Sequence, residues 1–327
     1  MPPSAGARIG AVAMALPDRR VTNREIAQRL GIDEEWFTKR TGTSERPWVR
    51  DGERMTELAA EAGREALERA QLGARELDLV LVATSSPDEI TPNAAVTVAG
   101  LLGAERAGAM DVGAACTGWL AALAVACGQI ESGRAQHALV IGSEVLSRLL
   151  DASDRDTVAL FADGAGAAVV SAGAEHDDGI GPILLRTDPA GADLIRLERS
   201  GTIQMQGYET FKAAVKAMSE VTLEALGAAG VELDEIDLFV YHQANSRIIR
   251  AVGQRLDLPG DRVVDYVARF ANSSTATLPI ALTVAEAEGR LKPGDRVLLA
   301  AFGGGFTWGA TVMRWHPHRV PSPVDSD

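Results

Sequence analysis

The feature that most constrains the fold of this chain is an internal repeat. Three pairs of residues are each separated by 159 positions: Ala66 and Ala225, Asp78 and Asp237, and Ala138 and Val297. Around them the hydrophobic periodicity predicts the same order of elements twice. The first set is helix 55–72, strands 77–83 and 109–112, helix 116–132 and strand 138–142. The second set is helix 210–227, strand 236–241, a turn at Asn272, a further helix and strand 296–301. A shared order at one spacing indicates a duplicated unit.

The alternation of helices with continuous apolar strands predicts an α/β protein whose mixed, largely parallel sheets are buried between helix layers. A small-residue stretch near 172–180 is typical of a linker. We therefore predict two halves, residues 1–172 and 173–316, followed by a flexible tail at 317–327. With the 159-residue spacing, Cys116 corresponds to Thr275, so the turns of the two halves are expected to face one another across a pseudo-twofold axis.

Cys116 is the candidate nucleophile, because it follows a strand-like apolar run and begins an alanine-rich helix. A helix N-terminus favours the thiolate, which is the nucleophilic form. His242 and Asn272 each follow another apolar segment, and a cysteine, a histidine and an asparagine in such positions are typical of covalent acyl-transfer enzymes. Taken singly, His242 could be a structural histidine and Asn272 a helix N-cap. Cys127, in mid-helix, is expected to be a core residue.

Composition narrows the class of protein. The net charge of −13 makes nonspecific binding to nucleic acid unfavourable. Two cysteines cannot build a disulfide framework or a typical zinc site. No apolar run is long enough to cross a membrane, and no signal peptide is apparent. We therefore expect a cytoplasmic enzyme without a metal, nucleic acid or membrane partner. The glycines at 163–167 lack the third glycine and the acidic residue of a dinucleotide loop, so they predict close backbone packing at a dimer or active-site wall.

Several longer motifs follow one another along the chain: Asp33-Glu34-Glu35-Trp36 with Arg40-Thr41-Gly42, Ala114-Ala115-Cys116-Thr117-Gly118, residues 161–167, His242-Gln243-Ala244-Asn245, and residues 302–309. On these motifs the chain resembles the thiolase superfamily, and most closely the β-ketoacyl-acyl-carrier-protein synthase III family, from Arg8 to about Trp315. The resemblance implies a five-layered αβαβα fold, a homodimer, and decarboxylating Claisen condensation of an acyl-CoA starter with malonyl-acyl-carrier protein.

The same resemblance implies roles for individual residues. Cys116 would carry the acyl group as a thioester, and His242 and Asn272 would donate hydrogen bonds to the enolate oxygen of the malonyl thioester. Each such donor typically contributes about 2.7–4 kcal/mol. The backbone N–H groups of Cys116 and Gly304 would form the oxyanion hole, where glycine allows close approach. Acyl-CoA is a substrate here, and no cofactor is expected.

Substrate contacts follow from the resemblance as well. The CoA-binding residues would be Trp36, Arg40, Arg155, Gly207 and Asn245. A basic patch for the acidic carrier protein would consist of Lys212, Arg247 and Arg250. Simpler interpretations stay open: Trp36 could serve only packing, and Lys212 and Arg247 could be solvated surface charges.

Some positions differ from the family pattern and leave the starter and the pathway, fatty-acid or polyketide, open. Thr91 stands where a bulky aromatic residue commonly closes the acyl pocket of the partner subunit, although it could also be a surface-turn residue. Thr117, Trp119 and Ala162 replace commoner choices near the nucleophile, and the stretch 171–205 is short. An alternative function is acyl transfer from CoA or a carrier protein to another acceptor without decarboxylation, which Asn272 disfavours. A non-catalytic scaffold is disfavoured because Cys116, His242 and Asn272 are all present.

Overall fold

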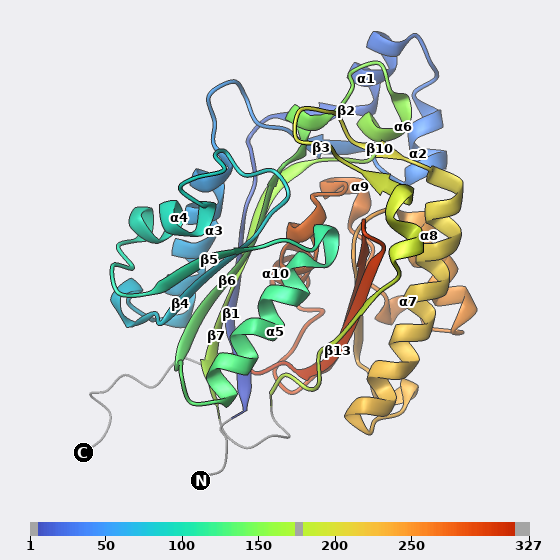
Figure 1. Cartoon of the computed structure of the whole chain (residues 1–327). Coiled ribbons are helices and arrows are strands. Elements are labelled where there is room, and N and C mark those ends of the chain that lie inside the picture. Colours follow the sequence, from blue (N-terminus) through green and yellow to red (C-terminus); the bar gives the residue numbers. More distant parts are fainter. Residues whose placement is uncertain (1–5, 174–178, 318–327) are drawn as a thin grey trace, which may run out of the picture.

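The computed structural model describes residues 6–173 and 179–317. The predicted linker near 172–180 and the predicted tail at 317–327 therefore lie largely outside the described residues. Two sheets form the centre of the molecule (Figure 1). The first has the strand order β1 (Ala7–Ala15), β7 (Asp163–Ala172), β6 (His137–Val145), β4 (Leu79–Ala83) and β5 (Gly108–Val112). The second has the order β11 (Leu238–Tyr241), β12 (Arg296–Gly303), β13 (Thr307–Arg314) and β8 (Leu184–Thr187).

Both sheets are mixed, but the prediction that they are largely parallel was wrong. Among the described strands, the two sheets contain three parallel pairs, β4–β5, β4–β6 and β11–β12, against four antiparallel pairs. The reason is that β7 and β13 run antiparallel to β6 and β12. Residues 163–167 belong to β7 rather than to a loop, and a Cβ on Gly166 would lie 2.9 Å from the Ile280 backbone nitrogen. These glycines therefore pack closely, as expected, but the backbone they pack against belongs to α10 (Thr277–Ala287) of the second half.

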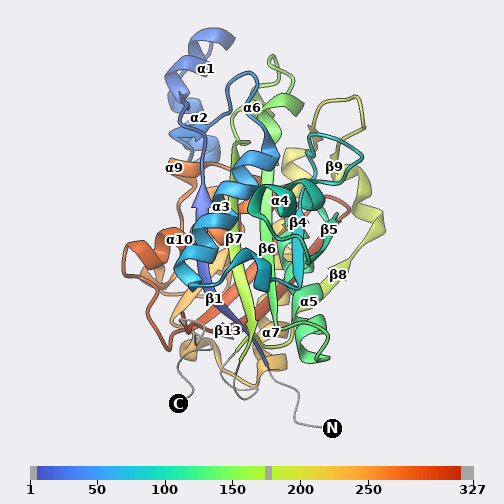
Figure 2. The same ribbon diagram turned by 90° about the vertical axis from the view of Figure 1, so that its left-hand side faces the viewer.

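Helices and sheets alternate in five layers (Figures 1 and 2). The outer face of the first sheet is covered by α3 (Met55–Ala70) and α4 (Ala94–Leu102). Between the two sheets lie α5 (Gly118–Glu131) and α10 (Thr277–Ala287). The outer face of the second sheet is covered by α7 (Gly207–Ala229) and α8 (Ser246–Arg255). This is the predicted αβαβα arrangement. No helix in the described part of the chain is long and apolar enough to span a membrane.

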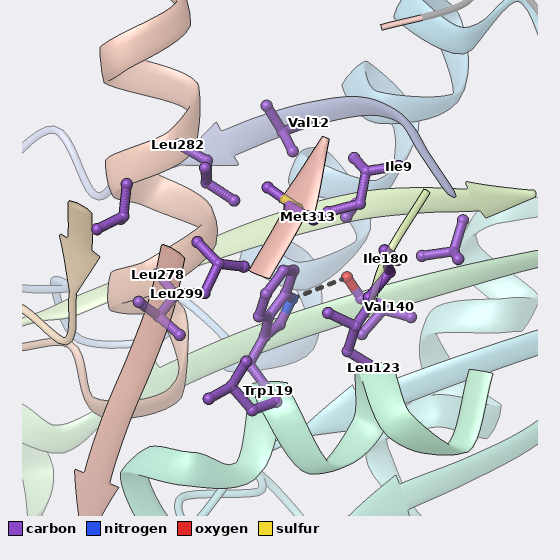
Figure 3. Close-up of a cluster of buried hydrophobic side chains, with 14 of the residues drawn as sticks. Ile9, Val12, Trp119, Leu123, Val140, Ile180, Leu278, Leu282, Leu299 and Met313 are labelled. Atoms are coloured by element: carbon purple, nitrogen blue, oxygen red, sulfur yellow. Dashed lines mark hydrogen bonds between the residues drawn. The ribbon is translucent and has the colours of Figure 1, made fainter. Parts of the chain in front are cut away.

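The central layer is held together by apolar side chains from both halves (Figure 3). Trp119 of α5 is fully buried there, and its indole N–H donates a hydrogen bond of 3.3 Å to the carbonyl oxygen of Val140. Leu278 and Leu282 of α10 and Met313 of β13 lie in the same cluster. Because each buried side chain of this size stabilises the fold by about 1.5–3 kcal/mol, the two halves are expected to fold together rather than separately.

The structure confirms the internal repeat. Helices α5 and α10 begin at Gly118 and Thr277, 159 residues apart, and the strands β4 and β11 begin at the same separation. Asp78 and Asp237 make matching contacts, because each carboxylate accepts from the first backbone N–H of the neighbouring strand, β6 or β12. The repeat fails at one strand: where the first half has β5, the second has α9 (Val267–Phe270).

Short elements inserted around the repeat form a cap at one end of the sheets, seen at the top of Figure 1. The cap comprises β2 (Arg20–Thr22), α1 (Asn23–Leu30), α2 (Glu35–Thr41), β3 (Glu45–Pro47) and α6 (Arg155–Val158). Strands β9 (Ile195–Arg196) and β10 (Gln204–Met205) form a small hairpin next to it. The fully buried guanidinium of Arg46 donates to the backbone of Val21 and Ala159, so it ties β2 to the end of α6.

Candidate active site

A cavity of about 660 Å³ extends from the cap toward the junction of the two repeats. Cys116, His242 and Asn272 all line it, so the structure brings together the three residues that the sequence singled out. Cys116 and Asn272 come from equivalent turns of the two repeats: Cys116 lies in the 3-10 helix η2 (Ala115–Thr117) before α5, and Asn272 precedes the 3-10 helix η8 (Ser274–Ala276) before α10. His242 directly follows β11.

The backbone at the two turns is strained in the same way. Ala115 has φ of 45° and Ser274 has φ of 49°, which is the left-handed region that side chains other than glycine rarely adopt. The two residues are 159 positions apart, so they are equivalent in the repeat. The turns contact one another, as predicted from the correspondence of Cys116 with Thr275. Strain of this kind is concentrated at functional sites.

The expected low pKa of the Cys116 thiol is not found. Burial raises its pKa to about 12, even though a hydrogen bond with Ser274 acts in the opposite direction. Because α5 itself starts at Gly118, the thiol lies one 3-10 turn before the helix that was expected to stabilise a thiolate. Cys116 is therefore expected to be a neutral thiol near pH 7, and it becomes nucleophilic only when its proton is removed.

His242 is buried, and the first residue of α10 orients its ring. Its Nδ1 lies 2.6 Å from the hydroxyl of Thr277, and its Nε2 has no hydrogen-bond partner among the described residues. Burial lowers the pKa of the imidazole to about 3, so the ring is neutral. A buried polar atom without a partner costs free energy, and such an atom at a cavity wall indicates a place for a ligand group.

Asn272 combines the two roles considered for it. Its Oδ1 accepts a hydrogen bond of 2.8 Å from the backbone N–H of Ser274, as in a capping turn. This fixes the side chain, so its Nδ2 group remains available as a donor. Its backbone N–H donates to the carbonyl of Leu160 over 2.9 Å, which anchors the turn to the segment that leads into β7. The capping function thus orients the amide at the cavity rather than competing with a catalytic role.

Within the protein, the glycine that permits close packing against the nucleophile turn is Gly303, the neighbour of the predicted oxyanion-hole residue Gly304. A Cβ on Gly303 would lie 2.7 Å from the backbone nitrogen of Cys116, whereas one on Gly304 would lie 3.2 Å from the carbonyl of Ile195. Gly304 does line the cavity, together with Cys116. A bare backbone is therefore required at Gly303, where β12 packs against the nucleophile turn, and the role of Gly304 as an oxyanion donor stays a prediction.

The predicted CoA-binding residues lie at the exposed end of the cavity, which all of them line: Trp36, Arg40, Arg155, Gly207 and Asn245. The Arg155 guanidinium stacks on the Trp36 ring at 5.0 Å, so these two residues of the cap form one platform. The Asn245 amide donates to the backbone carbonyl of Arg40 over 3.2 Å and caps α8. Asn245 therefore connects the cap to α8 as well as lining the cavity.

The three predicted carrier-docking residues are exposed, but only Arg247 lines the cavity. Its guanidinium lies 5.4 Å from the ring of Phe211. Lys212 pairs with Glu209 over 3.0 Å, and Arg250 lies 3.8 Å from Asp265. Both pairs are solvent-exposed at least in part, so each neutralises some of the positive charge of the patch without immobilising it.

The residues at the apolar end of the cavity had not been identified from the sequence. They are Leu146, Leu160, Phe161, Ile195, Leu197, Ile203 and Met205. Thr117, Trp119 and Ala162, which differ from the commoner choices near the nucleophile, are buried and are not among the residues that line the cavity. Thr91 is exposed and lies outside the cavity of its own chain, and Ile90 beside it is 74% exposed. A role across a dimer thus stays a prediction.

One charged residue close to the site was also missed. Glu144, near the end of β6, is fully buried behind the nucleophile turn. The sequence contains a signal for it, because a carboxylate interrupts an otherwise apolar strand. Buried carboxylates are rare unless they have partners.

Known proteins resemble this chain over nearly its whole length. Residues 110–189 match the family described as 3-oxoacyl-(acyl-carrier-protein) synthase III, and residues 226–315 match its C-terminal region. A β-ketoacyl-(acyl-carrier-protein) synthase III of Rhizorhabdus wittichii is 42% identical over 308 residues, which are 92% of this chain and 97% of that protein. The corresponding protein of Sphingopyxis alaskensis is 44% identical over 92% of this chain and 96% of its own length. The chain belongs to the β-ketoacyl-acyl-carrier-protein synthase III family.

Solved structures agree. The 3-oxoacyl-(acyl-carrier-protein) synthase III of Aquifex aeolicus superposes with a TM-score of 0.92 at 40% identity, covering 95% of this chain and 100% of that one. The priming β-ketosynthase of the R1128 polyketide pathway superposes with a TM-score of 0.93 at 32% identity, covering 97% and 98%. The fold is therefore that of condensing enzymes from both fatty-acid and polyketide routes.

Proposed function

We propose that this enzyme condenses an acyl-CoA starter with malonyl-acyl-carrier protein, with loss of CO2, and thereby initiates fatty-acid or polyketide synthesis. The observation that carries the proposal is the arrangement of Cys116, His242 and Asn272 around one cavity. Cys116 lines the cavity, and His242 Nε2 has no hydrogen-bond partner among the described residues. The Asn272 side chain is held through its Oδ1, and its Nδ2 group is the proposed donor to the substrate.

In the first half-reaction the Cys116 sulfur attacks the thioester carbon of acyl-CoA. The carbonyl oxygen becomes negatively charged, and the backbone N–H groups of Cys116 and Gly304 are the proposed oxyanion hole. The bond from carbon to the CoA sulfur then breaks, so that CoA leaves and the acyl group stays on Cys116. The Trp36–Arg155 platform, with Arg40, Gly207 and Asn245, is proposed to hold CoA in the open part of the cavity.

In the second half-reaction the malonyl carboxylate leaves as CO2, and negative charge develops on the thioester oxygen. His242 and Asn272 are proposed to donate hydrogen bonds to that oxygen. The resulting enolate carbon attacks the acyl carbon, Cys116 is released, and the product is a 3-oxoacyl-carrier protein. Because the thiol and these two donors supply the groups that both steps require, we propose that the enzyme uses no cofactor.

We further propose a cytoplasmic homodimer. Strand β5 is an edge strand of the first sheet, and large exposed apolar residues gather on it and on the neighbouring segments: Ile90, Val96, Leu101, Met110 and Val125. A row of unpaired backbone groups beside exposed apolar residues is typical of a strand that pairs with another chain. A second copy would bring Thr91 to the acyl cavity of its neighbour. The cytoplasm is proposed because the nucleophilic thiol must stay reduced.

The test separates condensation from plain acyl transfer. The enzyme is incubated with acyl-CoA of graded length and weighed intact, and CO2 release is then measured with malonyl-acyl-carrier protein. The wild type is expected to gain the mass of the acyl group and Cys116→Ala to gain none. His242→Ala and Asn272→Ala are expected to acylate but to lose roughly 100- to 1,000-fold in CO2 release. Acylation without any CO2 release by the wild type would instead support the alternative, transfer to another acceptor.

A further inference from the structure

The two turns that carry the proposed oxyanion hole touch each other through their backbones. Cys116 lies in η2, and Gly304 is the first residue of the short connection between β12 and β13. A Cβ on the preceding Gly303 would lie 2.7 Å from the Cys116 nitrogen, so the two backbones are in close contact there. No backbone–backbone hydrogen bond joins these turns in the described part of the chain. Contact at a bare glycine limits how closely the turns approach, but it does not stop one from sliding along the other.

A pair of hydroxyl groups connects the same two turns. Thr117 directly follows the nucleophile, and its hydroxyl oxygen lies 2.9 Å from that of Thr307, the first residue of β13. The Thr117 hydroxyl donates over 2.6 Å to the carbonyl oxygen of Ala114, at the start of the nucleophile turn. Because each hydroxyl has one hydrogen, the Thr307 hydroxyl is then the donor in the bridge to Thr117. Its other acceptor within reach is the carbonyl oxygen of Gly304, at 3.2 Å.

The local fold does not require this bridge. Thr117 is buried, and its hydrogen bond to Ala114 already satisfies its hydroxyl hydrogen. In the equivalent turn before α10, the residue 159 positions later is Ala276, which has no hydroxyl. A turn of this shape therefore forms without a hydroxyl at that position. The hydroxyl is present in the turn that carries the nucleophile and absent from its counterpart.

We propose that Thr117 and Thr307 are positioning residues that hold the two donors of the oxyanion hole, the N–H groups of Cys116 and Gly304, at a fixed separation. The inference rests on the proposed function, because that function assigns the two N–H groups to the acyl oxygen. Neither threonine is among the residues that line the cavity, so each acts through the turn to which it belongs.

Acyl transfer is sensitive to the separation of the two donors. The thioester oxygen becomes charged as the sulfur adds to its carbon, and both N–H groups must lie within hydrogen-bond distance of that one oxygen. The two donors lie far apart in the chain, in different halves of the repeat. A hydroxyl bridge between their turns fixes both before the reaction, so that neither has to be reoriented while the charge develops.

The test compares two reactions of the Cys116 sulfur in the same variant. Acylation by acyl-CoA passes through an oxyanion, whereas alkylation by iodoacetamide attacks a saturated carbon and does not. Thr117→Val keeps the outline of the side chain and removes the hydroxyl. It is expected to acylate about tenfold more slowly in a single turnover, a smaller loss than the roughly 100- to 1,000-fold that follows outright removal of an oxyanion donor. Its rate of alkylation, and the pH dependence of that rate, are expected to match the wild type.

Other variants make the result specific. Thr117→Ser restores the hydroxyl and is expected to recover most of the lost acylation rate. Thr307→Val removes the bridge from the other side, and because both valine variants remove the same hydrogen bond, the double variant is expected to lose no more than either alone. Thr222→Val is the matched control, since the buried Thr222 hydroxyl also donates to a carbonyl, over 2.8 Å, and lies 3.2 Å from a second hydroxyl, that of Tyr241. Thr222 does not line the cavity, so its variant is expected to acylate at the wild-type rate.

Thermal unfolding identifies any variant that does not fold, and Thr117→Val and Thr307→Val test the bridge independently. Equal losses of acylation and alkylation would overturn the inference, because the nucleophile itself would then have moved. Wild-type acylation by a folded valine variant would overturn it as well, as would losses that multiply in the double variant. A wild type that no acyl-CoA acylates would refute the proposed function itself, so the two failures are distinguishable.

Discussion

Gly303→Ala is expected to damage the enzyme more than any comparable change at a glycine of the cavity. The added Cβ would lie 2.7 Å from the Cys116 nitrogen and 3.2 Å from the Thr117 nitrogen. Ordinary contact begins at 3.4 Å, so the nucleophile turn must move by about 0.7 Å or β12 must yield. Both are backbone segments inside a packed core, and neither can avoid the contact by rotating a side chain.

The magnitude follows from the position of the clash. A displacement approaching 1 Å at the reacting group costs roughly 100-fold in rate. Overpacking a core costs about 1–3 kcal/mol of unfolding free energy. Single-turnover acylation of Cys116, followed by intact mass, measures the first effect, and thermal unfolding measures the second. We expect a large fall in the acylation rate with only a small loss of unfolding free energy, because the turn carries the nucleophile and one proposed oxyanion donor.

Two controls make the result specific. Gly304→Ala places its Cβ 3.2 Å from the Ile195 carbonyl and is expected to lose less. Gly128→Ala, in mid-helix with nothing within 4 Å, is expected to acylate normally and to be slightly more stable. Acylation by a folded Gly303→Ala at the wild-type rate would refute the account of why glycine is required there.

Three further predictions concern pH, docking and starter size. The pKa of His242 is 6.5 in the unfolded chain and about 3 in the folded one, so the unfolded chain binds more protons between these values. The free energy of unfolding therefore falls as pH drops from about 6.5 toward 3, by up to about 1.4 kcal/mol per pH unit. His242→Gln is expected to flatten this part of a plot of Tm against pH. Lys212→Glu with Arg247→Glu is expected to raise the KM for the acidic carrier protein and to reduce its salt dependence while acyl-CoA loading continues; an unchanged KM would exclude this surface. Thr91→Phe is expected to retain acetyl-CoA as a starter and to lose medium-length or branched starters in competition assays, and an unaltered preference would place Thr91 outside the pocket.

The sequence predicted those parts of the fold that repeat and missed those that do not. Strands such as β4 and β11 are continuous apolar runs, and their 159-residue spacing identified them twice. Strand β7 begins with alternating glycine and alanine, which lack the apolar bulk that normally indicates a strand, so its antiparallel course was missed. Whether two strands pair parallel or antiparallel depends on the path of the connection between them, and local hydrophobic periodicity contains no information about that path.

The candidate site shows the same division between residue identity and environment. Cys116, His242 and Asn272 could be selected because their residue types and positions at strand ends suit one chemistry. Their protonation states could not be predicted from the sequence, because burial decides them. The cavity that desolvates the thiol is assembled from segments far apart in the chain. A helix N-terminus argues for a thiolate, yet burial of the thiol, with the nearby Glu144 carboxylate, raises its pKa instead. The environment of the thiol is built where the two repeats meet, since the Thr275 hydroxyl of the second repeat donates to the Ala83 carbonyl and lies 3.3 Å from the Glu144 carboxylate of the first. Such an environment exists only in the assembled fold, so no local sequence pattern contains it.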